Sequence, residues 1–344
     1  MQMLTRSRSL GALAAGVAAT ALPHRARAAT AFSAGQIGNS IGFFPLYVAQ
    51  NQGFFRDAGL DVTITAFQSG TLVGTAMTSG SVDIGCGVIT DVFALLRAGR
   101  SAKVVGSLVD GYYIDIIASN QMLAATKLSR ASRLNDRIDA LRGKKIGITG
   151  PGSGTEALIV YLLKSRNIDP TRDVELVNMG TDQAAILVAM RTGRIDGVSF
   201  AWPLSMIAET QNVGQGFIVP AAGDVPAMRG EVQGVMYARE DVLGRKENEI
   251  VGFVRAIGRA EALIRQDPVR MRGLLKQYDA NMSDASIDKL FAAYLPALPN
   301  QARVGVASYE KAVAFHRAIG YIAGSGNNYG DVVASYIIDK ALRP

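Results

Sequence analysis

The stretches AMTSGSVD at residues 76–83 and AMRTGRID at residues 189–196 are two versions of one pattern, 113 positions apart. In each, a helical pattern ends at a glycine, and an apolar residue followed by aspartate then leads into a buried strand. The pairs Gly70-Thr71 and Gly180-Thr181 match as well, 110 positions apart. Two matches at nearly equal spacing, in the same order of elements, predict two similarly wound halves.

Short apolar runs alternate with helical periodicity from residue 34 onward, which indicates α/β sheets. For the first half, the pattern predicts strands over 34–37, 62–66, 84–86 and 103–108, and helices over 46–57, 71–78 and 91–97. For the second half, it predicts strands over 145–149, 174–177 and 197–201, and helices over 155–166 and 183–191. The mixed charges of 130–142 favour a solvated helix.

Two β-rich runs, 113–119 and 234–238, are predicted to carry the chain from one half to the other. After residue 240 the pattern turns helical, with helices expected over 247–265, 269–278, 284–293 and 309–325. The predicted fold class is therefore α/β, with two doubly wound lobes joined by crossing strands and a helical C-terminal third packed on the first lobe. The expected domains are a signal peptide at 1–28, a first lobe of 29–113 plus 236–344, and a second lobe of 114–235.

The N-terminal segment has the pattern of an export signal. Arg6 and Arg8 precede an uncharged run at 10–22, and Ala-Arg-Ala at 26–28 fits a cleavage site near Ala28. The run is too short to span a bilayer, although an N-terminal anchor is the alternative. We therefore expect an exported protein, most simply in a bacterial periplasm. Without the four arginines of this segment the net charge falls from +7 to +3, so no nucleic-acid partner is expected.

Composition restricts the chemistry further. With 49% hydrophobic residues the 344-residue chain is not disordered, and a single cysteine, Cys86, rules out an internal disulfide. Two histidines leave little for a His-based metal centre, and we expect neither a metal nor a cofactor. His316 lacks a plausible nucleophile partner, and Asp83 and Asp196 fit turn or capping roles better than paired catalysis. The sequence therefore does not predict an enzyme.

Small hydroxyls, glycines and aromatic residues gather at the predicted strand-to-helix turns. In open α/β sheets, ligands bind beyond the carboxyl ends of the strands. The glycine-rich turn at 147–156 is neither a dinucleotide fingerprint nor a P-loop, but it exposes a helix N-terminus that favours an acceptor group. Three alternatives stay open here. Ser153 and Thr155 either cap that helix or contact ligand, Asp91 caps a helix or receives an amine, and Trp202 is core or a ligand platform. The candidate ligand-binding residues are Asn39, Ser40, Phe43, Gly70, Thr71, Thr90, Asp91, Tyr112, Ser153, Thr155 and Trp202.

The run FPLYVAQNQGFFRDAGLDV at 44–62 resembles the opening of a known family, the nitrate/sulfonate/taurine/thiamine-precursor family of ABC-transporter substrate-binding proteins. The phrases at 80–85, 141–147 and 193–197 fall where that family places similar ones. The resemblance implies a monomeric two-lobed periplasmic receptor that closes on a small-molecule solute and delivers it to an ABC permease in the inner membrane. It also implies that the ligand lies between the turns, at Asn39, Ser40, Gly70, Thr71, Thr90, Ser153, Thr155 and Trp202.

One position departs from the family pattern. Many relatives carry an acid just before the proline that follows the second-lobe strand, where this chain has Trp202-Pro203. A sulfonate, a taurine-like molecule, a carboxylate and a nitrogen heterocycle all remain open as solutes. Two other functions stay open as well: a ligand sensor that serves no transporter, and an enzyme related to the yeast-type pyrimidine synthases. Those synthases depend on a Cys-rich motif and an active-site histidine.

Overall fold

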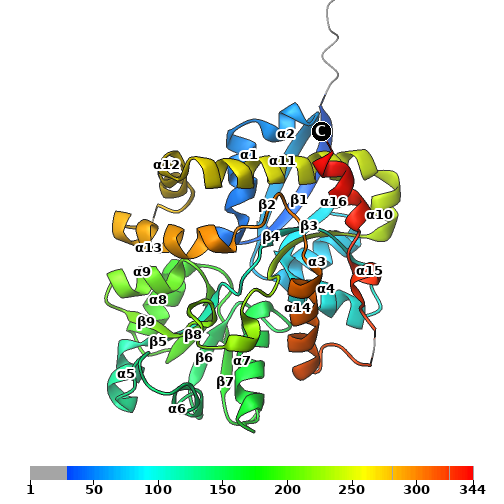
Figure 1. The fold of residues 1–344 in the computed structure, drawn as a ribbon. Helices are drawn as coiled ribbons and strands as arrows, with labels where there is room; N and C mark the ends of the chain where they lie inside the picture. The colour runs from blue at the N-terminus through cyan, green and yellow to red at the C-terminus, as the bar shows by residue number, and fades with distance from the viewer. Residues whose placement is uncertain (1–28, 281, 325, 344) are drawn as a thin grey trace, which may run out of the picture.

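Residues 29–280, 282–324 and 326–343 are described by the computed structural model, and the predicted signal peptide lies outside them. They form two five-stranded sheets surrounded by helices, which confirms the predicted two-lobed α/β class (Figure 1). The first sheet has the order β2-β1-β3-β10-β4, and the second has the order β7-β6-β8-β5-β9. The strands are β1 (Thr30–Ile37), β2 (Leu60–Phe67), β3 (Ile84–Val88), β4 (Lys103–Val109), β5 (Ile114–Ser119), β6 (Lys145–Ile148), β7 (Glu175–Asn178), β8 (Gly197–Ala201), β9 (Gly214–Ile218) and β10 (Gly234–Ala238).

The two sheets share one topology. In the first, β1 runs parallel to β2 and β3, while β10 is antiparallel to β3 and β4. In the second, β6 runs parallel to β7 and β8, while β5 is antiparallel to β8 and β9. The chain therefore crosses between the sheets after β4 and returns before β10. The division into lobes stays a prediction, and its boundary after residue 235 falls inside β10.

Helices cover both sheets and form the C-terminal third (Figure 1). The predicted helix over 46–57 is two helices, because Gly53 adopts a left-handed φ of 75° between them. The charged segment over 130–142 forms only a six-residue helix, and the helix predicted to reach 325 ends at Ala318. The helices are α1 (Phe44–Asn51), α2 (Phe54–Asp57), α3 (Gly70–Ser79), α4 (Ile89–Arg97), α5 (Asn120–Thr126), α6 (Leu134–Asp139), α7 (Gly154–Ser165), α8 (Gln183–Arg191), α9 (Leu204–Thr210), α10 (Glu240–Arg245), α11 (Glu247–Gln266), α12 (Pro268–Tyr278), α13 (Asp284–Tyr294), α14 (Val306–Ala318), α15 (Tyr329–Val332) and α16 (Ser335–Leu342).

The repeated octet builds the same corner in both sheets. Asp83 Oδ2 accepts a hydrogen bond of 2.9 Å from the backbone N–H of Ser33 at the neighbouring strand β1. Asp196 Oδ2 accepts the equivalent bond of 2.8 Å from the N–H of Lys145 at the start of β6. Each aspartate thus fixes the strand it introduces against the adjacent parallel strand. The predicted turn role of both aspartates is confirmed.

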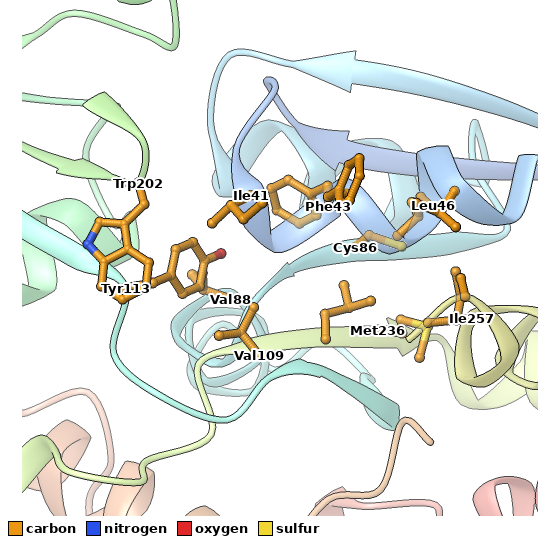
Figure 2. Close-up of a cluster of buried hydrophobic side chains, with 14 of the residues drawn as sticks. Ile41, Phe43, Leu46, Cys86, Val88, Val109, Tyr113, Trp202, Met236 and Ile257 are labelled. Carbon is orange, nitrogen blue, oxygen red and sulfur yellow. The ribbon is translucent and has the colours of Figure 1, made fainter. Parts of the chain in front are cut away.

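Helices of the C-terminal third pack against elements around the first sheet and also contact helices of the second half. Helix α11 packs against α1, α2 and α16, whereas α13 contacts α9 and α14 contacts both α4 and α7. The largest buried cluster extends from Leu46 and Ile257 under the first sheet to Tyr113 and Trp202 near the second (Figure 2). In the part of the chain that the structure describes, no helix has the length and apolar character needed to cross a bilayer.

Candidate ligand-binding cleft

A cavity lies between the two sheets, at the carboxyl ends of their parallel strands. Ile37 ends β1 and Val88 ends β3 on one side, while Ala201 ends β8 and Thr149 follows β6 on the other. Because parallel strands end at the same edge of a sheet, both sheets contribute wall residues to one cleft.

The N-terminus of α7 supplies the most ordered polar group of the cleft. Ser153 is the N-cap of α7, and its Oγ accepts a hydrogen bond of 3.3 Å from the N–H of Glu156. Thr155 Oγ1 accepts a bond of 2.9 Å from the N–H of Thr149 and lies 2.8 Å from Ser153 Oγ. Both hydroxyls also line the cavity. Capping and cavity lining therefore occur together, and this positive helix end faces the cleft.

The rest of the lining is apolar or uncharged. Phe43, Tyr113 and Phe200 contribute aromatic rings, and Ile114 adds an aliphatic wall. None of the lining residues is an aspartate, glutamate, lysine, arginine or histidine. The cleft thus suits a small solute with an apolar body and an acceptor group directed at α7. It offers no cationic side chain to neutralise a fully charged anion.

The two halves touch each other around the cleft. Thr71 Oγ1 donates a hydrogen bond of 2.9 Å to the carbonyl oxygen of Pro151 in the opposite half. Thr181 donates from its backbone N–H and its hydroxyl to Gln68 Oε1, at 3.0 and 3.1 Å. These bonds join turns of the first half to turns of the second. The structure therefore holds the two walls of the cleft in direct contact at these turns.

The cavity brings together six of the eleven predicted site residues, and Thr71 lies at the seam just described. The side chain of Thr90 is directed elsewhere, because its Oγ1 lies 2.8 Å from His316 Nε2 and the residue is fully buried. Tyr112 is also buried, and its hydroxyl lies 3.5 Å from the carbonyl oxygen of Gly154. The six predicted residues that line the cavity are Asn39, Ser40, Phe43, Gly70, Ser153 and Thr155.

Asp91 acts as a cap at the start of α4. Its Oδ2 accepts a hydrogen bond of 2.9 Å from the N–H of Val88, and burial raises the pKa of its carboxyl to about 7 despite this bond. Oδ1 lies directly below Gly70, where an added Cβ would approach it to 2.0 Å. Gly70 lines the cleft and Asp91 does not, so the carboxyl is separated from the cavity by this glycine.

For Trp202, the structure supports the core alternative. The indole is 3% exposed, packs beside Tyr113, and donates from Nε1 to Asp115 Oδ2 at 2.9 Å (Figure 2). It does not line the cleft. The position at the end of β8 suggested a platform, but Phe200 and Ala201 line the cavity while the Trp202 indole is bonded to Asp115 instead.

Sequence reasoning missed several lining residues. Most of them lie at the last position of a strand, directly after it, or at the crossing, whereas Phe200, Gly154 and Thr181 do not. The strand predictions contained this signal, because residues at the carboxyl ends were already known to flank any ligand. The residues missed are Ile37, Gly38, Val88, Tyr113, Ile114, Thr149, Gly154, Thr181, Phe200 and Ala201.

The thiol and the imidazole lie outside the cleft. Cys86 is fully buried, and burial raises the pKa of its thiol. His316 is fully buried in α14, where desolvation lowers the pKa of its imidazole to about 3, although a bond to the Ala312 carbonyl opposes the shift. Across the described residues, no group of three or more His, Cys, Asp or Glu side chains is placed to hold a metal ion.

Two mixed sheets, joined by crossing segments around a cleft at their strand ends, define the class of periplasmic-binding-protein folds. Within that class, the chain belongs to the NMT1-like family, whose model matches residues 37–272. This assignment agrees with the resemblance carried by 44–62.

Individual proteins give the same picture. The putative binding protein YtlA of Bacillus subtilis is 27% identical over 227 residues, which cover 66% of this chain and 64% of YtlA. The 4-amino-5-hydroxymethyl-2-methylpyrimidine phosphate synthase THI13 of Saccharomyces cerevisiae is 25% identical over 237 residues, covering 66% of this chain and 64% of the synthase. The periplasmic nitrate-binding protein NrtA of Synechocystis superposes with a TM-score of 0.68 at 14% identity, over 91% of this chain and 88% of NrtA. The matched region thus spans just under two thirds of YtlA and of THI13.

Proposed function

We propose that this protein is the periplasmic solute-binding component of an ABC importer, which captures a small organic solute in the cleft by closure of its two halves. The observation that carries the proposal is a cavity lined from both sheets and enclosed by bonds between them, such as Thr71 to Pro151. A ligand that touches both walls favours the closed form by what the second wall adds. Membership of the NMT1-like family supports a binding role.

The lining also narrows the solute class. Aromatic and aliphatic side chains surround most of the cavity, and its polar features are the α7 N-terminus and uncharged groups such as the Ser40 hydroxyl, which has no hydrogen-bond partner among the described residues. A neutral nitrogen heterocycle or a singly charged organic acid with an apolar body fits these walls. A multiply charged anion does not, because no lining side chain carries positive charge.

The alternative function is an enzyme related to the pyrimidine synthases, and the similarity to THI13 is the reason to consider it. The placement of the two most reactive side chains favours binding over that alternative. Cys86 and His316 are both fully buried, and neither lines the cleft. A sensor that delivers no solute to a permease would use the same closed form. Deletion of the permease genes, followed by solute-uptake assays, distinguishes the two roles.

The test is a thermal-shift screen on the chain from Ala29 onward, unfolded and refolded first to strip any bound solute. The panel holds pyrimidines, aromatic acids, alkanesulfonates, taurine and nitrate. A solute at 100 times its Kd raises the free energy of unfolding by about 2.7 kcal/mol, which is visible as a higher melting temperature. We expect the neutral heterocycles or aromatic acids to give the shift. A shift with nitrate alone would contradict the proposed solute class.

A matched pair of variants locates the binding. Ala201→Phe places a ring in the cleft, whereas Ala124→Phe places the same ring on the exposed surface of α5. We expect the thermal shift to disappear in the first variant and to persist in the second. An unchanged shift in Ala201→Phe would place the solute elsewhere.

A further inference from the structure

A second pocket adjoins the solute cleft and is bordered by exposed residues such as Asp182 and Ala184. Gly38, Asn39 and Thr181 line both this outer pocket and the cleft. Gly38 and Asn39 follow β1 of the first half, whereas Thr181 follows β7 of the second half. The boundary between the cleft and the outer pocket is therefore made of two turns, one from each half.

Side-chain amides hold these two turns together. Gln68, directly after β2, accepts hydrogen bonds at its Oε1 from the N–H and the hydroxyl of Thr181, at 3.0 and 3.1 Å. Gln183 Nε2 crosses the same boundary in the other direction and donates to the Asn39 carbonyl oxygen at 3.1 Å. Gln68 lines the outer pocket but not the cleft. It thus holds Thr181 from the outer side without forming part of the wall around a solute.

Gly38 allows the two turns to meet closely. Its φ is 47°, in the left-handed region that favours glycine, and an added Cβ would lie only 2.7 Å from Thr181 Cβ. A side chain at this position would push Thr181 away from the first half. The contact between Gly38 and Thr181 is thus as close as a residue without a side chain permits.

We propose that these two turns are a gate through which the solute passes between the outer pocket and the cleft, and that Gln68 is the positioning residue that keeps the gate shut. The proposal rests on the proposed function for what passes through, but the opening of the gate is a property of the chain alone. The Gln68 side chain is exposed, so water replaces its bonds to Thr181 at a small loss, and the gate opens transiently.

The test measures opening with a thiol reagent and without any solute. Ala201→Cys places a thiol in the wall of the cleft, and iodoacetamide is the probe. When opening and reclosing are fast, the rate of modification follows the open population. Cys86 is fully buried and burial raises its pKa, so the unmodified chain supplies the background rate. Ala124→Cys, on the exposed surface of α5, supplies the rate of a freely accessible thiol.

The first variant removes the acceptor of the two bonds. Combined with Ala201→Cys, Gln68→Ala should raise the rate of modification at least about fivefold. Gln121→Ala is the matched control, because Gln121 is exposed and donates to the Arg191 carbonyl oxygen within the second half. We expect no change in that control. An unchanged rate in Gln68→Ala overturns the proposal, and so does an equal acceleration in Gln121→Ala.

The second variant inserts a wedge between the turns. Gly38→Ala should also accelerate modification of the cysteine at position 201, because its methyl group displaces Thr181. Gly59→Ala is the control for backbone strain, since Gly59 has a φ of 74° and an added Cβ there meets no atom within 4 Å. A rate in Gly38→Ala no higher than in Gly59→Ala overturns the gate, and this comparison decides if Gln68→Ala does not fold. A thermal-shift screen without hits would contradict the proposed solute class and leave these rates unaffected.

Discussion

The corner that precedes β3 and the corner that precedes β8 have nearly the same sequence but different surroundings. At both, an aspartate accepts a backbone N–H from the neighbouring parallel strand, through Asp83 in one and Asp196 in the other. Asp83 additionally pairs with Lys246 Nζ at 2.6 Å, a residue at the start of α11. The repeated octet thus determines the local backbone, and the C-terminal third adds an ion pair at the corner of the first half.

The largest difference between the halves is expected at the matched glycines. An added Cβ at Gly70 would lie 2.0 Å from Asp91 Oδ1. Because the N–H of Val88 holds this carboxyl in place, Gly70→Ala should lower the free energy of unfolding by about 2–3 kcal/mol. At Gly180 the nearest atom, at 2.8 Å, is the end of the Gln68 side chain, and a left-handed φ of 64° adds strain, so Gly180→Ala should cost only about 1 kcal/mol. Urea unfolding of both variants measures the two costs. Equal losses of unfolding free energy in the two variants would show that the Asp91 side chain can shift at little cost.

The second comparison is between the stability losses caused by replacing Asp83 and Asp196. Asp83→Ala removes the acceptor for Ser33 and the partner of Lys246, and we expect a loss of about 2–3 kcal/mol. Asp196→Ala removes the acceptor for Lys145, for a loss of about 1 kcal/mol. Denaturant unfolding compares them, and Lys246→Met tests the source of the difference. If Lys246→Met leaves the gap between the two aspartate variants unchanged, the ion pair of Asp83 with Lys246 is not the source of the difference.

Lowering the pH should remove the extra stability that Asp83 gives to the first half. Partial burial acts to raise the pKa of Asp83, but hydrogen bonds from Lys246 and Ser33 outweigh it and hold the pKa below 3.8. A carboxyl with a depressed pKa stabilises the fold above its ordinary value, and this stabilisation is lost as the pH falls through the folded pKa. The gap in unfolding free energy between wild type and Asp83→Asn should therefore shrink below about pH 4. A gap that stays constant down to pH 2 would contradict this.

The smallest difference is expected at the helix ends of the octet. Gly80 and Gly193 have similar left-handed φ angles, 82° and 73°, so replacement by alanine should cost about 1 kcal/mol at each. Thermal unfolding should show the two variants within about 0.5 kcal/mol of each other. A clear inequality would mean that a neighbouring side chain changes the cost, either Arg239 at 3.5 Å from an added Cβ at Gly80 or Gln121 at 3.1 Å from one at Gly193.

The sequence predicted what depends on local pattern and left out what depends on packing. Strand β8, helix α8 and the capping by Ser153 followed from periodicity, glycines and hydroxyls close in the chain. Strand β9 was missed because Gly-Gln-Gly-Phe-Ile at 214–218 carries little strand pattern of its own and is held by pairing with β5. The same limit applies to the site. Thr90 has the residue type and the turn position of a ligand contact, but its hydroxyl faces His316, 226 positions away.

The central claim is that one small solute binds between the two halves, and isothermal titration calorimetry tests it most directly. The stripped protein is titrated with the compound that gives the largest thermal shift, in wild type, Ala201→Phe and Ala124→Phe. The account predicts one site per chain in wild type and in Ala124→Phe, and loss of binding in Ala201→Phe. Undiminished affinity in Ala201→Phe, or no binding by any compound of the panel, would contradict it.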